Sequence, residues 1–163
     1  MDELFAVPGA PWVRVDPALA KLRHILLGSG LAGLLVLCAL AWLLIPAGDV
    51  IGPVVALTGI VLVAAGWVVI GRNARSWAYA ERDEDLFITR GVLYRRLELV
   101  PYGRMQFVDV TAGPLERWLG IATVRLHTAS PDTRAHIPGL RSTEAGRLRD
   151  RLTELGEAQA AGL

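Results

Sequence analysis

The chain has 163 residues, a formal net charge of +1 and a mean hydropathy of +0.40, and hydrophobic residues make up 53% of it. This length allows one modest domain with a few additional elements, and the near-neutral charge gives no indication of a nucleic-acid partner. The single cysteine, Cys38, cannot form an intramolecular disulfide or a cysteine-based metal cluster. The histidines His24, His127 and His136 show no metal-binding spacing, and no cofactor-binding motif is present.

The first 24 residues are predicted to be an N-terminal cytoplasmic segment. They contain three prolines and show little periodicity. Two arrangements remain open for this segment. It lies along the membrane surface through Leu4, Phe5 and Trp12, or it packs on the domain that follows.

Two apolar blocks come next, at residues 25–45 and 50–70, and Asp49 is the only charged residue from Ile25 to Ile70. Each block has 21 residues, which as a helix would be about 31 Å long and would match the hydrocarbon core of a bilayer. Pro46 ends the first predicted helix, and Asp49 is a suitable N-cap for the second. The pattern predicts a transmembrane hairpin over residues 25–70, and therefore a multi-pass cell-membrane protein with two spans.

The distribution of basic residues predicts the orientation of this hairpin. Basic residues lie just outside both spans and are absent from the connecting turn; they are Arg14, Lys21, Arg23, Arg72, Arg75 and Arg82. The positive-inside rule therefore places the N- and C-termini in the cytoplasm.

Two other features of the hairpin have more than one interpretation. Tryptophans near its ends fit interfacial anchoring, although simple packing is the alternative; they are Trp12, Trp42, Trp67 and Trp77. Ala39-Leu40-Ala41 resembles a signal-peptidase site, but the apolar run continues to Ile45, which favours an uncleaved span.

Residues 71–163 are predicted to form a cytoplasmic domain of class α+β. Turn signals separate short strands at residues 85–91, 92–101, 104–110, 121–129 and 134–138. In the strand at 104–110, alternation would place Met105 and Phe107 on one side and Gln106 and Val108 on the other. From Ser142 the period becomes helical, with an apolar stripe of Ala145, Leu148, Leu152 and Leu155. This helix is expected to cover one open end of a curled antiparallel sheet.

The residues from Pro101 onward carry a family resemblance. The segment PYGRMQFVDVTAGPLERWLGIATVRLHTAS, followed by HIPGL, resembles the bacterial pleckstrin-homology-like (PH-like) domain of YdbS-like membrane proteins. The resemblance covers roughly residues 72–160, and such proteins also have paired spans upstream. The sequence departs from the family in two places, with methionine at 105 where isoleucine is commoner and a proline after Ala129-Ser130.

The resemblance implies a PH-like β-barrel or sandwich of two antiparallel sheets closed by a C-terminal helix. It implies no enzyme and supplies no catalytic residue. Members of the family are often encoded beside a larger multi-span relative, and they have been linked to resistance toward toxic peptides. The expected partners are therefore membrane lipids and another membrane protein or a second copy of the chain.

The polar residues Arg104, Gln106 and Arg117 are the candidate interaction surface. In the functional interpretation they form one shared polar surface for an acidic lipid head or a partner chain. In the structural interpretation the two arginines bond carbonyls at the bend after Gly113, and Gln106 satisfies a sheet edge or bulge. The structural interpretation is favoured.

Three functions from different classes follow. The leading hypothesis is a membrane-anchored, non-catalytic interaction module, a subunit of a complex with another PH-like membrane protein, in envelope stress or toxic-peptide resistance. The alternative is an anionic-lipid sensor, which would use Arg95, Arg96 and Arg104. An enzyme is disfavoured, because the only candidate groups are His127, Ser130 and Asp132, and no nucleophile motif surrounds them.

Overall fold

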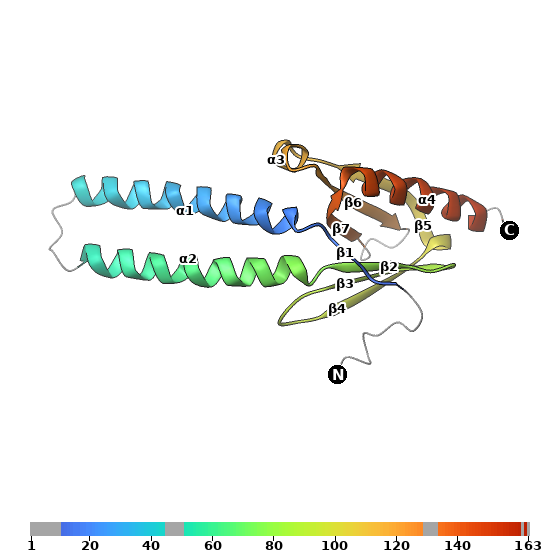
Figure 1. Ribbon diagram of the computed structural model, residues 1–163, viewed down its shortest axis with the longest axis horizontal. Helices are drawn as coiled ribbons and strands as arrows, with labels where there is room; N and C mark the ends of the chain where they lie inside the picture. Colours follow the sequence, from blue (N-terminus) through green and yellow to red (C-terminus); the bar gives the residue numbers. More distant parts are fainter. Residues whose placement is uncertain (1–10, 45–50, 129–133, 161, 163) are drawn as a thin grey trace.

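The structure, a computed structural model, describes residues 11–44, 51–128, 134–160 and 162. Its longest elements are two helices, α1 (Ala18–Leu44) and α2 (Ile51–Arg75). They lie side by side and extend together from one end of a β-domain (Figure 1). The turn between them, with the predicted roles of Pro46 and Asp49, lies outside the described residues.

Both helices have the length and composition of membrane spans. Candidate spans run from Ala18 to Leu40 and from Leu57 to Arg75, and only 6% of each is buried inside the chain. The core helix of a soluble protein would bury its apolar surface, whereas these helices expose leucine, isoleucine and valine side chains along their length. The predicted two-helix hairpin is confirmed, and each helix continues beyond its apolar block toward the domain.

Polar and aromatic contacts join the two helices where they approach the domain. The His24 ring stacks on Trp67 with 4.1 Å between centroids, and Arg23 Nη1 donates a hydrogen bond to Asn73 Oδ1 at 2.6 Å. Trp67 therefore packs within the hairpin while its side chain remains 52% exposed. These contacts fix the pairing of α1 and α2 at the end nearest the domain.

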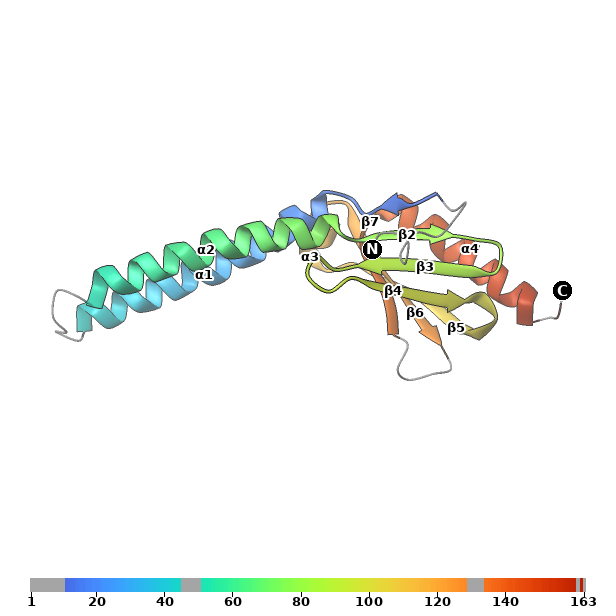
Figure 2. The same ribbon diagram turned by 90° about the horizontal axis from the view of Figure 1, so that it is seen from below.

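The domain contains two antiparallel sheets and two further helices (Figures 1 and 2). The first sheet has the order β1 (Val13–Arg14), β2 (Ala78–Glu81), β3 (Asp85–Arg90), β4 (Arg96–Pro101). The second has the order β5 (Met105–Thr111), β6 (Ile121–Thr128), β7 (Arg134–Arg141). A 3-10 turn, η2 (Tyr102–Arg104), precedes β5, the short helix α3 (Pro114–Trp118) joins β5 to β6, and α4 (Ser142–Ala160) follows β7. This arrangement confirms the α+β PH-like fold.

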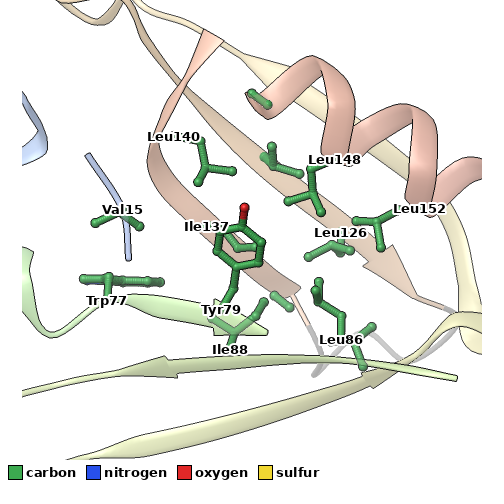
Figure 3. Packing of buried hydrophobic residues seen from close by; sticks show 14 of the residues in the cluster. Val15, Trp77, Tyr79, Leu86, Ile88, Leu126, Ile137, Leu140, Leu148 and Leu152 are labelled. Atoms are coloured by element: carbon green, nitrogen blue, oxygen red, sulfur yellow. The ribbon is translucent and has the colours of Figure 1, made fainter. Parts of the chain in front are cut away.

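The core lies between the two sheets and α4 (Figure 3). The predicted stripe on α4 is confirmed, since Ala145, Leu148 and Leu152 are fully buried and Leu155 packs at the margin. Of the two interpretations of Trp77, packing rather than interfacial anchoring is the one observed, since Trp77 is 5% exposed and belongs to this core. It directly follows the turn after α2, so it enters the domain rather than the membrane surface.

The N-terminal segment contributes to the domain where it is described. Val13 pairs with Tyr79 at the edge of the first sheet, and Val15 and Leu19 are buried in the core. Of the two open arrangements, residues 13–19 therefore follow the second and pack on the domain. Leu4 and Phe5 lie outside the described residues, and the three-part division of the chain stays a prediction.

Two sequence-based expectations about strands were wrong in detail. The strand predicted from residue 92 begins only at Arg96, because Gly91, with φ +104°, starts a tight turn that leaves Leu93 and Tyr94 88% and 81% exposed. A β-bulge between Met105 and Phe107 interrupts strict alternation in β5. As a result Met105 packs on the core, whereas Phe107 is 56% exposed.

Candidate interaction surfaces at the membrane end of the domain

The three predicted surface residues do not form one site. Arg104 ends η2, Gln106 lies in the bulge at the start of β5, and Arg117 is on α3, beyond the other end of that strand. Seven strand residues span about 20 Å, and both views place η2 and α3 at opposite ends of the domain (Figures 1 and 2). All three side chains are exposed, and within the described part of the chain none makes a hydrogen bond or ion pair.

The region around Arg104 is held by a buried tyrosine. Tyr102 has no exposed surface, and its hydroxyl donates to the Arg82 carbonyl at 2.9 Å. Burial raises the pKa of Tyr102 to about 12, so the hydroxyl keeps its proton and the hydrogen bond at neutral pH. Arg104 is therefore carried on a fixed turn, at the end of the domain remote from the helices.

At the opposite end, α3 presents an apolar surface. Glu116 holds this short helix in place, because its carboxylate accepts from the Gly113 N–H at 2.6 Å and from the Thr123 hydroxyl at 2.9 Å. With Glu116 turned toward β6, Leu115 and Trp118 face outward and are 38% and 74% exposed. Figure 1 places α3 beside the start of α1. We call Leu115, Arg117 and Trp118 the α3 surface.

A second feature at this end is an open cavity of about 580 Å³. It lies between the end of α2, the edge strand β1 and the β3–β4 turn, and four arginines line it: Arg14, Arg72, Arg75 and Arg95. Trp12 lies beside them, and the lining contains no acidic side chain. We call this the arginine cavity. Sequence analysis missed it because its four arginines come from three separate segments.

Several interactions fix the junction between the helices and the domain. Asp16 accepts from the Ala18 N–H at 2.8 Å as the N-cap of α1, with Pro17 at the first helical position. The same carboxylate accepts from Arg141 Nε at 2.7 Å, and the Asp16 N–H donates to the Gly139 carbonyl at 2.8 Å. The Arg141 guanidinium and the Ala18 N–H lower the pKa of Asp16 below its usual value. The sequence analysis began this helix at residue 25 and did not use the Asp16-Pro17 pair, which is a typical start signal.

A polar network fastens α4 across the first sheet. The Tyr79 hydroxyl donates to Glu144 Oε1 at 2.6 Å, and Arg147 bridges Glu144 to Glu81. Arg147 and Tyr79 together lower the pKa of Glu144, while burial raises that of Tyr79. These four groups satisfy one another, and we assign them to holding the helix rather than to chemistry.

Of the three groups considered for catalysis, His127 lies within the described residues. His127 stacks on Phe107 with 4.1 Å between ring centroids. Ser130 and Asp132 lie outside the described residues. Within the described ranges, no group of three or more histidine, cysteine or acidic side chains is arranged to hold a metal ion.

A PH-like domain carried on two apolar helices defines a class of membrane-associated protein, and comparison with known proteins gives the family. The model of the family described as "Bacterial PH domain" matches residues 16–156, and the chain belongs to this family. It is YdbS-like: it is 37% identical over 79 residues to the "UPF0699 transmembrane protein YdbS" of Bacillus subtilis (strain 168). That match covers 48% of this chain and 48% of the relative, so the chain aligns with about half of the relative's length. No solved structure matches.

Proposed function

We propose that the chain is a membrane-anchored, non-catalytic interaction module that assembles with another PH-like membrane protein. The observation that carries this proposal is the α3 surface. Trp118 exposes 74% of its surface beside the partly exposed Leu115, and exposed tryptophans in apolar surroundings are common centres of protein–protein binding. Because α3 lies at the end of the domain from which the helices leave, a docked partner would also lie close to the membrane.

The absence of catalysis is part of this proposal. The buried polar groups of the described core are paired within networks that hold turns and helices, as at Tyr79 and Tyr102. Membership of a PH-domain family and similarity to a protein described only as a transmembrane protein agree with a binding role. The proposed setting is envelope stress or resistance to toxic peptides, as the family resemblance implies.

The proposed orientation places both chain termini and the domain in the cytoplasm. Arg72 and Arg75 lie in the last turns of α2, and Lys21 and Arg23 lie in the first turns of α1, all at the domain end of the hairpin. Positive residues are retained on the cytoplasmic side during insertion. The arrangement of the helices therefore supports the orientation expected from the sequence.

The test is purification of the tagged full-length chain from native membranes, with and without Trp118→Ala. We expect the wild-type chain to recover a second PH-like membrane protein in stoichiometric amount. Trp118→Ala should reduce recovery at least tenfold, because truncating a central tryptophan typically costs about 2 kcal/mol or more. Phe107→Ala, which removes an aromatic ring 56% exposed elsewhere on the domain, is the matched control. Recovery of the wild-type chain alone as a monomer would contradict the proposal.

The second candidate function is sensing of anionic lipids. The residues first considered for it are dispersed, since Arg95 and Arg96 lie at the β3–β4 turn and Arg104 lies at the remote end of the domain. The arginine cavity supports lipid sensing through a different set of residues, of which only Arg95 was among those first considered. Arg104 and Gln106 remain predictions of a surface without a defined ligand, whereas Arg117 belongs to the α3 surface.

A further inference from the structure

We infer that the arginine cavity binds the phosphate of an anionic phospholipid headgroup. The inference rests on membrane anchoring by α1 and α2 and deepens the lipid-sensing candidate. Four arginines are among the residues that line this cavity of about 580 Å³, and the lining contains no acidic residue. The chain as a whole has a net charge of only +1, so this is a strong local excess of positive charge. Arginine is well suited to phosphate because its planar fork donates two parallel hydrogen bonds.

Three of the four arginines make no contact in the described part of the chain that would account for their position beside the cavity. Within the described residues, the side chains of Arg14, Arg72 and Arg75 make no ion pair or hydrogen bond, and all three are exposed. Elsewhere on the domain, Arg90 pairs with Glu98 and Arg147 with Glu81. Like charges that lie close together repel one another, so a bound anion would stabilise the site.

The position of the cavity along the hairpin selects a lipid as the source of the phosphate. Ile70 ends the apolar block of α2, and at 1.5 Å per residue Arg72 and Arg75 lie about 3 and 8 Å beyond it. The headgroup layer on each side of the hydrocarbon core is about 5–8 Å thick. Both arginines therefore lie at the depth of the phosphates, and Trp12 in the lining is the residue type that favours this layer.

The residues at the rim of the cavity also fit a lipid as the ligand. Gly91, Val92 and Arg95 line the cavity, and the residues between them, Leu93 and Tyr94, are 88% and 81% exposed. The β3–β4 turn that carries them lies at the end of the domain nearest the helices (Figures 1 and 2). An exposed leucine and tyrosine beside a basic site fit insertion into the bilayer interface. Their insertion would keep the rim of the cavity at the lipid surface.

The experiment measures lipid binding to the purified full-length chain in neutral detergent by native mass spectrometry, with phosphatidylglycerol and phosphatidylcholine as probes. The wild-type chain should bind phosphatidylglycerol at least tenfold more tightly than phosphatidylcholine. The double variant Arg14→Gln/Arg75→Gln should lose about tenfold or more of the phosphatidylglycerol affinity. The matched control Arg82→Gln/Arg125→Gln removes the same charge from exposed positions outside the cavity and should bind as the wild type does.

One further variant and one competition measurement complete the test. Arg95→Gln, a milder single change in the same cavity, should weaken phosphatidylglycerol binding severalfold even if the double variant does not fold. Inorganic phosphate at millimolar concentration should leave lipid binding unchanged, and displacement of the lipid would assign the site to a soluble anion instead. Equal wild-type affinity for both lipids, or equal losses in the cavity and control variants, would overturn the inference and leave an acidic segment of a protein as the partner. None of these outcomes depends on recovery of a partner protein. Failure of the lipid inference can therefore be distinguished from failure of the proposed function.

Discussion

At the scale of single residues, Gly139 is a position where the domain lies directly against the start of α1. It has φ +70°, and a Cβ atom added there would lie 2.6 Å from the Cβ of Leu19, in the first turn of α1. Gly120 has the same φ of +70°, but an added Cβ would meet nothing within 4 Å. The two glycines therefore separate backbone strain from contact with α1.

We predict that Gly139→Ala destabilises the domain by about 2–4 kcal/mol, the sum of left-handed backbone strain and overpacking against Leu19. Gly120→Ala should cost only the backbone part, about 1 kcal/mol. Urea unfolding of the full-length chain in neutral detergent, followed by near-ultraviolet circular dichroism, measures both changes. Equal losses in the two variants would show that β7 does not pack against α1 as described.

At the scale of elements, the start of α1 depends on one ionised carboxylate. The pKa of Asp16 is lowered from its usual 3.8, chiefly by Arg141. A carboxylate with a lowered pKa contributes stability that is fully present above its unfolded-state pKa and is lost as the pH falls through the lower folded-state value. The N-cap and the Arg141 ion pair should therefore weaken only in acid.

We predict that Asp16→Asn lowers the melting temperature of the chain at pH 6 and that its difference from the wild type shrinks as the pH falls below about 3.8. Asparagine still caps a helix, so the change isolates the ionised pair with Arg141. Thermal unfolding at several pH values between 6 and 3 provides the measurement. Asp150→Asn, which removes an exposed ion pair with Arg149 on α4, is the control and should lower the melting temperature much less at pH 6. A difference that does not vary with pH would disprove the role given to the Asp16 charge.

The sequence predicted the elements whose pattern is local. The two apolar blocks and the stripe from Ala145 to Leu155 identify α1, α2 and α4 because each helix buries or exposes one kind of side chain along its own length. The bulge after Met105 was missed because it is set by pairing with the partner strand β6. The late start of β4 was missed because the tight turn at Gly91, rather than alternation, determines where the strand begins. Burial of Trp77 in the core also depends on distant residues that a linear pattern does not show.

The candidate sites were predictable only in part, for the same physical reason. Arg117 could be named from the sequence, but the exposure of Trp118 depends on Glu116 turning toward Thr123. The arginine cavity assembles residues that are more than 50 positions apart, from Arg14 to Arg72. Convergence over such distances is a property of the folded chain and leaves no spacing signal.

At the scale of the whole molecule, the hairpin and the domain form one continuous structure. α1 begins inside the domain, where Leu19 joins the core, and α2 leads within three residues into β2. The α3 surface and the arginine cavity both lie at the end where these helices leave. The proposed interactions, with a membrane partner and with lipid headgroups, therefore depend on which side of the membrane this end occupies.

The most direct test of that orientation is labelling of single cysteines in intact cells with a membrane-impermeant maleimide. In a Cys38→Ser background, Ala47→Cys reports on the connection between the spans and Glu157→Cys on the end of α4. The proposed topology predicts that Ala47→Cys is labelled in intact cells, that Glu157→Cys is labelled only after permeabilisation, and that both variants stay in the membrane fraction. Labelling of Glu157→Cys in intact cells, or recovery of the chain in the soluble fraction without detergent, would contradict the account.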